Sequence, residues 1–478
     1  MLIGREEERR LLLSLLDSDK SEFVAVYGRR RVGKTYLVRE TFNYGFSFQH
    51  SGLPDATTKE QLEEFAHSLA TAGARKVKTP KNWQDAFFAL QQLLGALPAG
   101  GKKVLFIDEL PWLDTPASKF VAALDHFWNG WATARRDIVL VVCGSATSWV
   151  MDKIVMNYGG LHNRLTRQIY LAPFTLHDCE EYARQRNLGM SRRNILETYM
   201  VLGGIPYYWD FMRSDLSWAQ NIDRMLFRRN GELRHEFDAL YRSLFRHPQA
   251  YIGVVTALGT KKAGMTRNEL MAATAEYQGS TLTKVLRELE QCDFIRSFSA
   301  IGKMRKETVY QLIDNFTLFH FKFLANHRAT DGDYWTRIIA KPVYSAWSGL
   351  AFERVGLQHI GQIKKALGIT GIISNVCSWR YQPQAEAGKG DEKGAQIDMV
   401  IDRDDNVVNL CEMKFAQGEY AVTQQYDAEL RRKMSLFVER THTRKGVSLV
   451  IITSYGIKRN EWSGDIQRQL TMDDLFAE

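Results

Sequence analysis

Short apolar runs alternate with helical patterns over the first third of the chain. Residues 22–27, 103–107 and 138–143 are runs rich in Val, Leu, Ile or Phe, and leucines recur at helical spacing over residues 5–16. Buried strands that are separated by helices predict a parallel sheet covered on both faces. We therefore expect an α/β domain over residues 1–173.

The middle of the chain has two different patterns. Residues 174–246 lose the strand pattern, and their apolar spacing predicts a set of helices. Residues 247–330 predict three helices and then two short strands, which the basic segment 302–306 joins. The polar stretch 331–341 predicts a linker to the next domain.

The pattern over residues 340–478 predicts a second α/β domain. Apolar and polar residues alternate in its strands, as they do in a half-buried sheet. Its predicted elements are a helix over 344–360, strands at 396–401 and 407–415, a helix ending near residue 440 and a strand at 447–453.

The composition of the 478 residues is that of a globular protein, with 45% hydrophobic and 25% charged residues. The five cysteines form no CxxC pair, which argues against a zinc ribbon or a disulfide framework. No apolar run reaches the ~18 residues that a membrane span needs. We expect a soluble, cytoplasmic protein without a membrane partner. The net charge of +8 mildly favours a polyanionic partner such as DNA.

Residues 28–35 match the pattern G-x-x-x-x-G-K-[ST], between an apolar strand and a helix. Such a loop turns successive backbone N–H groups toward phosphate oxygens, while Lys34 neutralises the β- and γ-phosphates and Thr35 holds Mg²⁺. The motif predicts that the chain binds ATP with Mg²⁺. The residues predicted to contact the nucleotide here are Gly28, Arg29, Arg30, Arg31, Val32, Gly33, Lys34, Thr35 and Tyr36.

Two acids end the strand at 103–107, and a serine follows the strand at 138–143. Asp108 is predicted to bind the Mg²⁺ shell, and Glu109 to orient and polarise the water that attacks the γ-phosphate. Ser145 is a candidate sensor of that phosphate. The alternatives are a solvated strand end for the two acids and a simple strand cap for the serine.

These motifs together resemble the archaeal-type AAA+ ATPases, a branch near the STAND and origin-recognition ATPases, over about residues 1–320. The resemblance implies that Arg5 lies near the adenine pocket, that residues 174–246 form a helical lid, and that Arg164 reaches the nucleotide of a neighbouring subunit in a homo-oligomer. Other AAA+ branches carry an asparagine where this chain has Ser145, and a surface arginine is the alternative for Arg164. The matching segments are Ile3-Gly-Arg5-Glu, the P-loop with its three arginines, Asp108-Glu109, Gly144-Ser145, Arg164 with Ile169-Tyr-Leu-Ala-Pro-Phe174, and Gly203-Gly-Ile-Pro206.

The order of elements over residues 247–330 is that of a winged helix. A helix begins at Thr266, and the next helix buries a stripe of leucines and valine while its other face is polar and basic. Helices of this kind enter a DNA groove or contact phosphates, although winged helices also pack against other domains. The residues predicted to contact DNA are Lys284 and Arg287 on the helix and Lys303, Arg305 and Lys306 on the wing.

Acids and a lysine cluster in the predicted C-terminal sheet. A hairpin through residues 404–406 would bring Asp398 beside Glu412, with Lys414 on the same strand face, and Glu353 could reach them from the preceding helix. Oxygen ligands of this kind suit Mg²⁺ or Mn²⁺, here held by Asp398 and Glu412, and a neighbouring lysine can activate water for phosphodiester hydrolysis.

The elements and residues over about 340–478 resemble the PD-(D/E)xK nuclease fold, and specifically the domain commonly fused to this ATPase type. The fold often places a supporting polar residue where Gln424 and Gln425 stand. Taken singly, each acid and lysine is an ordinary surface residue, and related domains can keep the acids yet only bind DNA.

The sequence therefore predicts an α/β protein with a P-loop AAA+ core, a helical lid, a winged helix and a restriction-endonuclease-like domain. We expect it to bind and hydrolyse ATP, to bind DNA, and to carry a metal-dependent nuclease-like domain that the nucleotide state controls. The alternative is a STAND-like ATP-dependent switch whose C-terminal domain binds DNA or a partner without cleavage. A protein-remodelling ATPase is disfavoured, because it leaves the winged helix and the C-terminal acids unexplained.

Overall fold

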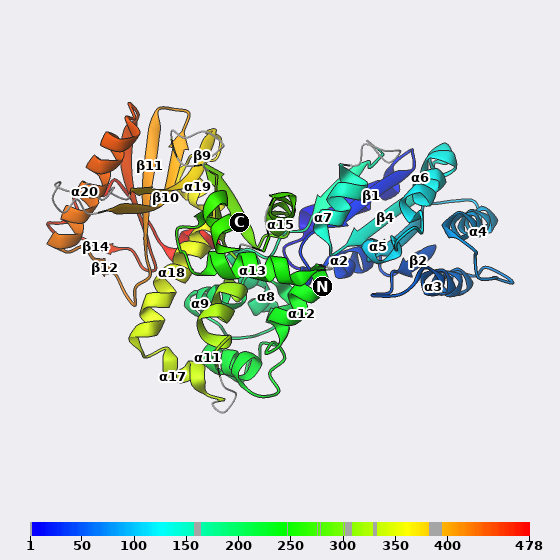
Figure 1. Cartoon of the computed structure of the whole chain (residues 1–478), viewed down its shortest axis with the longest axis horizontal. Coiled ribbons are helices and arrows are strands. Elements are labelled where there is room, and N and C mark those ends of the chain that lie inside the picture. Colours follow the sequence, from blue (N-terminus) through cyan, green and yellow to red (C-terminus); the bar gives the residue numbers. More distant parts are fainter. Residues whose placement is uncertain are drawn as a thin grey trace. The chain divides into compact units, whose positions relative to one another are not determined.

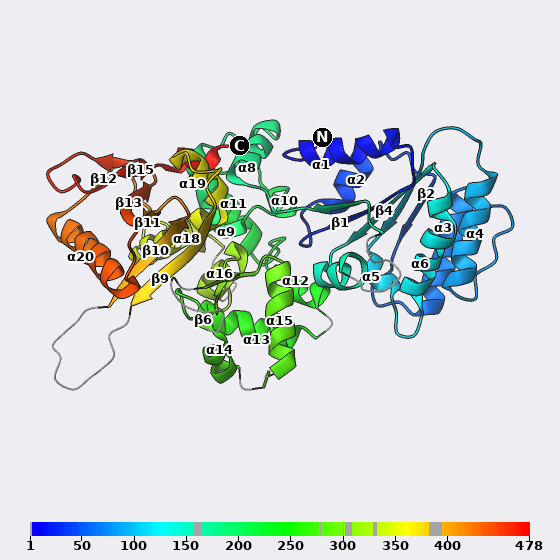
Figure 2. The ribbon, with the colours of Figure 1, turned by 90° about the horizontal axis from the view of Figure 1, so that it is seen from above.

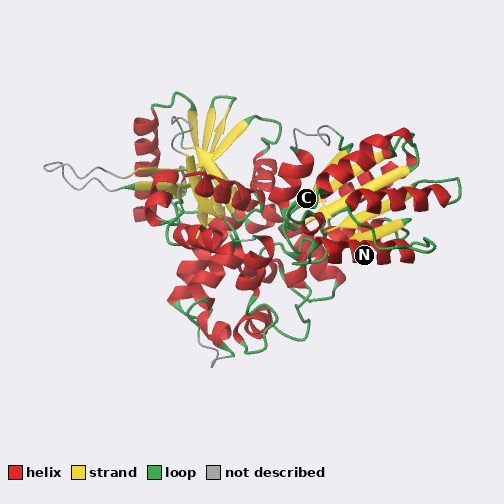
Figure 3. Ribbon diagram, turned by 45° about the vertical axis from the view of Figure 1, so that its right-hand side comes forward, coloured by secondary structure: helices red, strands yellow, loops and turns green. Residues whose placement is uncertain are grey.

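The structure is a computed structural model, and its strands form sheets in both of the compact units into which the chain divides (Figures 1 and 3). The first unit comprises Met1–Pro173, Ile205–Tyr207 and Ser243–Arg246, and the second comprises Phe174–Gly204, Tyr208–Arg242 and His247–Glu478. The residues described are 2–156, 164–245, 247–274, 276–277, 279–299, 301, 308–327, 332–381 and 394–478.

A five-stranded sheet in the order β2-β3-β4-β1-β5 forms the centre of the first unit, and all of its strand pairs are parallel. The order is not sequential, because β4 lies between β1 and β3. Loops that follow these three strands therefore meet at one edge of the sheet. The strands are β1 Glu22–Tyr27, β2 Phe48–Ser51, β3 Lys103–Asp108, β4 Ile138–Gly144 and β5 Arg167–Tyr170.

The three strands expected from apolar runs are all present, as β1, β3 and β4, and the predicted parallel α/β sheet is confirmed. Strands β2 and β5 lie at the two edges of the sheet and were not expected from the pattern. In β5 only Ile169 is buried, so its sequence lacks the apolar run by which a central strand is found.

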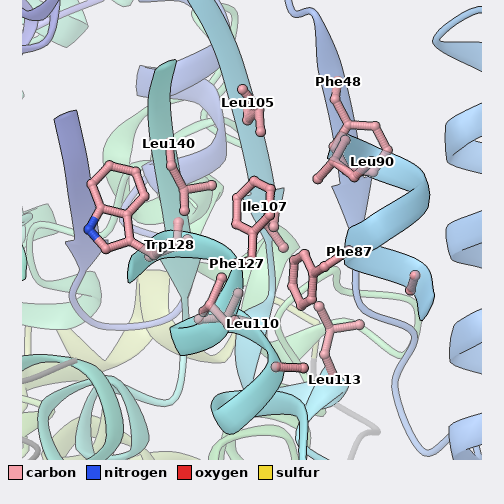
Figure 4. Close-up of a cluster of buried hydrophobic side chains, with 14 of the residues drawn as sticks. Phe48, Phe87, Leu90, Leu105, Ile107, Leu110, Leu113, Phe127, Trp128 and Leu140 are labelled. Carbon is pink, nitrogen blue, oxygen red and sulfur yellow. The ribbon is translucent and has the colours of Figure 1, made fainter. Parts of the chain in front are cut away.

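Helices cover both faces of this sheet (Figure 2). One face packs against α3 (Thr58–Thr71), α4 (Trp83–Ala96) and α6 (Phe120–Gly130) in an aromatic-rich core that Figure 4 shows, and α1 (Glu6–Ser14) and α2 (Lys34–Thr41) lie on the other side. Burial of a large apolar side chain stabilises the fold by about 1.5–3 kcal/mol. The core side chains labelled in Figure 4 are Phe48, Phe87, Leu90, Leu105, Ile107, Leu110, Leu113, Phe127, Trp128 and Leu140.

The second unit begins with helices, as its sequence predicts. They are α8 Leu176–Gln185, α9 Arg192–Leu202, α11 Trp218–Ile222 and most of α12 Glu236–Leu244; the last two residues of α12 and the first two of the short α10 Pro206–Trp209 are assigned to the first unit.

A small antiparallel sheet with three helices follows. The helices are α13 (Pro248–Gly259), α14 (Arg267–Ala273) and α15 (Gly279–Gln291), and the sheet has the order β6-β8-β7. Thr266 and Glu269 form a capping box at the start of α14, which explains where this helix begins. The strands are β6 Met265–Thr266, β7 Ile295–Ser299 and β8 Thr308–Leu312.

The C-terminal sheet has the order β15-β13-β11-β10-β9 and mixes antiparallel with parallel pairs. Strands β9, β10 and β11 pair antiparallel, and β13 joins β11 in parallel after the helix α20 (Gln424–Thr441). Helix α18 (Pro342–Gln358) contains Glu353, and α19 (Ile360–Leu367) follows it. The strands are β9 Ser374–Tyr381, β10 Ala395–Arg403, β11 Val407–Lys414, β13 Gly446–Thr453 and β15 Arg468–Leu470.

The prediction of a linker at 331–341 is wrong for the described part of that stretch, which forms the helix α17 (Tyr334–Ile338). Trp335 is fully buried, and its ring centroid lies 4.9 Å from that of Phe319 and 5.4 Å from that of Trp347. The buried carboxylate of Asp223 accepts hydrogen bonds from the backbone N–H groups of Trp335 and Thr336, at 2.6 and 2.9 Å. A single aromatic residue and a distant helix cap thus make a polar stretch part of the core.

In the part of the chain that the structure describes, every helix is too short or too polar to cross a lipid bilayer.

Candidate functional site

The P-loop leaves β1 and enters α2 with the backbone that a phosphate-binding turn needs. Gly28 has φ 147°, and a Cβ atom there would lie 2.3 Å from the carbonyl oxygen of Leu171, so the position accepts only glycine. Gly33 has φ 94° and stands directly before the first turn of α2. The first N–H groups of this helix are therefore directed into the loop, which is the arrangement that can bind an anion.

Lys34 is buried inside this loop, with 6% of its surface exposed. Its Nζ donates hydrogen bonds to the carbonyl oxygens of Gly28 and Arg29, both at 2.9 Å. The loop carbonyls thus hold the ammonium group at the centre of the turn, where its charge faces an incoming phosphate.

Thr35 and Asp108 come from separate elements and meet at the carboxyl edge of the sheet. Thr35 Oγ1, in the first turn of α2, donates to Asp108 Oδ2 at the end of β3, at 2.7 Å. Burial raises the pKa of Asp108, while the hydrogen bond from Thr35 opposes that shift. A hydroxyl and a carboxylate oxygen in contact are the protein ligands that Mg²⁺ uses in P-loop sites, so these two residues fit the ion.

Glu109 and Ser145 are also brought together, from the ends of β3 and β4. Glu109 adopts a left-handed backbone conformation with φ 48°, and its Oε2 accepts a hydrogen bond from Ser145 Oγ at 2.8 Å. Asp108 Oδ1 accepts a hydrogen bond from the N–H of Glu109 at 2.9 Å, which fixes this turn. The predicted water-activating acid is therefore engaged by the predicted sensor serine.

Arg5 is buried and ties the start of the chain to the segment after β5, because its Nη2 donates to the carbonyl oxygen of Ala172 at 2.6 Å. The same side chain borders a cavity of about 250 Å³. The role of Arg5 at the adenine stays a prediction. The residues that line the cavity are Leu2, Arg5, Glu6, Arg9 and Glu40.

The remaining predicted nucleotide residues differ in exposure. Arg31 has φ 69°, and its guanidinium carbon lies 4.2 Å from the ring centroid of Tyr207. Arg29 is buried, and Tyr36 is 45% exposed. Arg30 is partly exposed and Val32 is buried. Arg164 is exposed in the turn before β5, so a role in a neighbouring subunit stays a prediction.

The C-terminal carboxylates Glu353, Asp398 and Glu412, which we call the acidic centre, are gathered as the sequence predicts. Met399 pairs with Cys411 in the hairpin of β10 and β11, and Asp398 Oδ2 accepts a hydrogen bond from the N–H of Met413 at 3.1 Å. Burial, together with the charge of Asp398, raises the pKa of both Glu353 and Glu412.

Two lysines that the sequence did not indicate form ion pairs with the acidic centre. Lys262 Nζ lies 2.7 Å from Glu353 Oε1 and 3.8 Å from Asp398 Oδ1. Lys433 Nζ, from α20, lies 2.8 Å from both oxygens of Glu412. Within the described residues, no group of three or more His, Cys, Asp or Glu side chains is placed to hold a metal ion. In this arrangement the acidic centre does not fit the Mg²⁺ or Mn²⁺ that its residue types suggested.

Lys414 lies two residues after Glu412 in β11, and its Nζ is 4.7 Å from the ring centroid of Tyr426. Tyr426 OH in turn lies 3.5 Å from Glu412 Oε2. Gln424 and Gln425 are exposed at the first turn of α20. The lysine is therefore close to the acids, but Lys433 makes the direct ion pair with Glu412.

The predicted DNA-contacting helix is α15, and its expected two faces are present. Leu282, Val285, Leu286 and Leu289 are buried. Lys284 and Arg287 are both exposed on the other face. The predicted wing residues Lys303, Arg305 and Lys306 lie outside the described residues.

One of the comparisons with known proteins concerns the N-terminal part of the chain. Residues 2–210 match the family model of an ATPase domain predominantly from Archaea. This part of the chain is similar to an ATPase domain. Together with the geometry of the P-loop, the match supports ATP binding and hydrolysis.

One curated relative matches along nearly the whole chain. It is the uncharacterized protein MJECL04 of Methanocaldococcus jannaschii, 24% identical over 446 residues that cover 91% of this chain and 92% of the relative. Among solved structures, the Walker-type ATPase PABY2304 of Pyrococcus abyssi has a TM-score of 0.47 and 18% identity, covering 67% of this chain and 96% of its own. The ORC2 protein of Aeropyrum pernix has a TM-score of 0.40 and 13% identity, covering 73% and 96%.

Sequence reasoning missed Lys262 and Lys433, and only one of them carried a signal. Lys433 stands in the buried stripe of α20, since it follows Leu430 by three positions and precedes Phe437 by four. A lysine among buried positions indicates a buried carboxylate partner. Lys262 lies in a turn between α13 and β6, 91 residues before Glu353, and nothing in its local sequence points to that partner.

Proposed function

We propose that this protein is an ATP-binding and ATP-hydrolysing, DNA-binding switch. The observation that carries the ATPase proposal is the contact of Thr35 with Asp108 at 2.7 Å beside the buried Lys34. Lys34 and Thr35 lie at the start of α2, after β1, and Asp108 ends β3, so the fold must bring these elements together to place the three side chains. Their combined chemistry fits a Mg²⁺-bound triphosphate.

Binding of the triphosphate begins with Lys34, which exchanges the carbonyl oxygens of Gly28 and Arg29 for phosphate oxygens. The N–H groups at the start of α2 hold the same phosphates. Thr35 and Asp108 would hold Mg²⁺, which would supply positive charge to the phosphates.

Hydrolysis needs Glu109 to orient a water toward the γ-phosphate and to accept its proton. In the structure only Oε2 of this carboxylate accepts the hydrogen bond from Ser145 Oγ, and the water would bind to the carboxylate in the presence of ATP. Ser145 is the candidate sensor that would donate to the γ-phosphate. The exposed Arg164 completes the site of a neighbouring copy in a homo-oligomer, where it neutralises transition-state charge.

The test of this proposal is ATP hydrolysis by the full chain, measured as phosphate release with and without Mg²⁺. We expect Mg²⁺-dependent turnover, in the range of P-loop ATPases. If the wild-type chain releases phosphate no faster than the Lys34→Ala variant, the proposal is refuted. A control with Mg²⁺ and a non-hydrolysable ATP analogue separates binding from chemistry.

DNA binding is proposed for the winged-helix unit, residues 247–330, with α15 as the helix that enters a groove. The exposed Lys284 and Arg287 support it, since they share the face opposite the buried leucine stripe. Both would act through phosphates, which position a protein on DNA without reading its sequence.

Replacing Lys284 and Arg287 together with alanine is expected to weaken binding to every DNA sequence alike and to flatten its salt dependence. Each lost phosphate contact reduces the slope of log K against log salt by about 0.9, so the pair should reduce it by about two units. The measurement is fluorescence anisotropy over a salt series. Lys458 and Arg459, also exposed, provide a matched double-alanine control. An unchanged slope would assign α15 a purely structural role.

For residues 340–478 we propose a fold related to the PD-(D/E)xK nucleases, supported by the order α18, β10, β11, α20, β13 and by the acidic centre. Of the two functions considered for this domain, a role in binding DNA or a partner without cleavage is the better supported. Each of the three carboxylates already lies within 4 Å of a lysine of the chain, and no group of metal-holding side chains is found among the described residues.

A further inference from the structure

Lys262 contacts helix α18 through both its ammonium group and its backbone carbonyl group. Helix α18 supplies Glu353 to the acidic centre. The ammonium group of Lys262 contacts Glu353 at 2.7 Å, while its backbone carbonyl oxygen accepts a hydrogen bond from Arg354 Nη2 at 2.7 Å. Gln311 Nε2, from β8, donates to the same carbonyl at 2.8 Å. The turn between α13 and β6 is thereby fastened to a helix that lies about 90 residues later in the chain.

The ammonium group also takes the electrostatic place of a bound cation. Glu353 and Asp398 are 14% and 9% exposed, and two carboxylates this close repel each other unless a positive charge lies between them. Lys262 Nζ supplies that charge, since it lies 2.7 Å from one carboxylate and 3.8 Å from the other. Lys433 likewise supplies a positive charge to Glu412, at 2.8 Å.

The two lysines differ in how easily they can leave. Lys433 is 11% exposed and bonds both oxygens of its partner, whereas Lys262 is 36% exposed and comes from a turn. Lys262 is therefore the group that can move away while the C-terminal sheet stays folded.

We propose that Lys262 is an internal cation that closes the acidic centre to divalent metal ions, so that a metal ion binds there only when the side chain of Lys262 swings away from the carboxylates. The winged-helix unit, which contains Lys262, then controls the charge of the C-terminal domain. The proposal concerns metal binding in the absence of nucleotide and DNA, so it stands or fails independently of the ATPase and DNA-binding proposals.

The experiment is a Mn²⁺ titration of the nucleotide-free full chain, read by the electron paramagnetic resonance signal of free Mn²⁺. Lys262→Met removes the charge and keeps the length of the side chain. We expect it to bind Mn²⁺ at least about tenfold more tightly than the wild-type chain, because one opposing charge within 4 Å of the carboxylates is lost. Lys261→Met is the matched control, since Lys261 is the neighbouring lysine and pairs with Glu269 instead.

A second substitution locates the gained ion. Adding Asp398→Asn to Lys262→Met should return Mn²⁺ binding to the wild-type level, and a gain that survives this change lies elsewhere and overturns the proposal. Equal Mn²⁺ affinity of Lys262→Met and the wild-type chain would also overturn it.

Folding of each variant is checked by circular dichroism and thermal unfolding with a chelator present. Should Lys262→Met fail to fold, Lys262→Gln, which can still donate a hydrogen bond to Glu353, carries the same expectation. If neither variant folds, the proposal is wrong, because a cation that can leave cannot be one that the fold requires.

Discussion

Replacing Lys34 with alanine is expected to abolish tight ATP binding and ATP turnover together. The ammonium group is buried in the loop, where the carbonyl oxygens of Gly28 and Arg29 hold it at 2.9 Å. Without it the phosphates lose charge-assisted hydrogen bonds worth roughly 3 kcal/mol, which is about a hundredfold in affinity. Titration calorimetry with ATP and Mg²⁺ measures the affinity, and phosphate release measures the turnover.

The control for this variant is Lys59→Ala, because Lys59 is 83% exposed on α3, where it makes a surface contact with Glu63 at 3.7 Å. We expect wild-type affinity and turnover from it. Thermal unfolding of both variants checks that the first unit remains folded. Wild-type ATP affinity in a folded Lys34→Ala chain would contradict the assignment of residues 28–35 as the phosphate-binding loop.

The nucleotide site could be predicted in large part because its signals are local. A strand, a glycine-rich turn and a helix follow one another around Lys34, and Asp108 ends an apolar run that is easily recognised as a strand. The parallel sheet then requires these strand ends to meet. What the pattern could not predict is the hydrogen bond of Ser145 to Glu109, because it depends on the left-handed backbone of Glu109 and on the insertion of β4 between β1 and β3.

The second unit contains contacts that sequence reasoning could not predict. The hairpin of β10 and β11 was predictable, since its alternation is regular and Asp404 to Asn406 form the turn. Trp335 was not, because one of its partners, Asp223, which accepts a hydrogen bond from its N–H, lies 112 residues earlier. The same reason applies to Lys262, whose partner is 91 residues away. Contacts of this range are properties of the assembled fold, and no periodicity along the chain records them.

The lysines change the interpretation of residues that the sequence grouped correctly. Glu353, Asp398 and Glu412 do come together, and from their types alone a metal site follows. The structure adds two cations to the group, from Lys262 and Lys433. Residue types therefore identify which side chains act together, while the charge state of the group, and with it the choice between metal binding and a closed ion cluster, depends on neighbours from other elements.

Replacing Glu109 with glutamine is expected to separate ATP binding from hydrolysis. Glutamine keeps the size of the side chain, and its carbonyl oxygen can still accept the hydrogen bond that Ser145 Oγ donates at 2.8 Å. The turn, Lys34 and the contact between Thr35 and Asp108 are therefore expected to stay in place, and ATP affinity should remain near that of the wild-type chain. Only the ability to accept a proton from the attacking water is lost.

General-base catalysis contributes about 10²–10⁴-fold, so turnover should fall by at least about a hundredfold while bound ATP is retained. Filter binding with radiolabelled ATP and phosphate release, measured on the same sample, give the two quantities. Glu64→Gln is the matched control, since Glu64 is 42% exposed on α3 and is expected to leave both quantities unchanged. If Glu109→Gln hydrolyses ATP at the wild-type rate, another group activates the water, and the contact between Glu109 and Ser145 is a structural cap of the two strands.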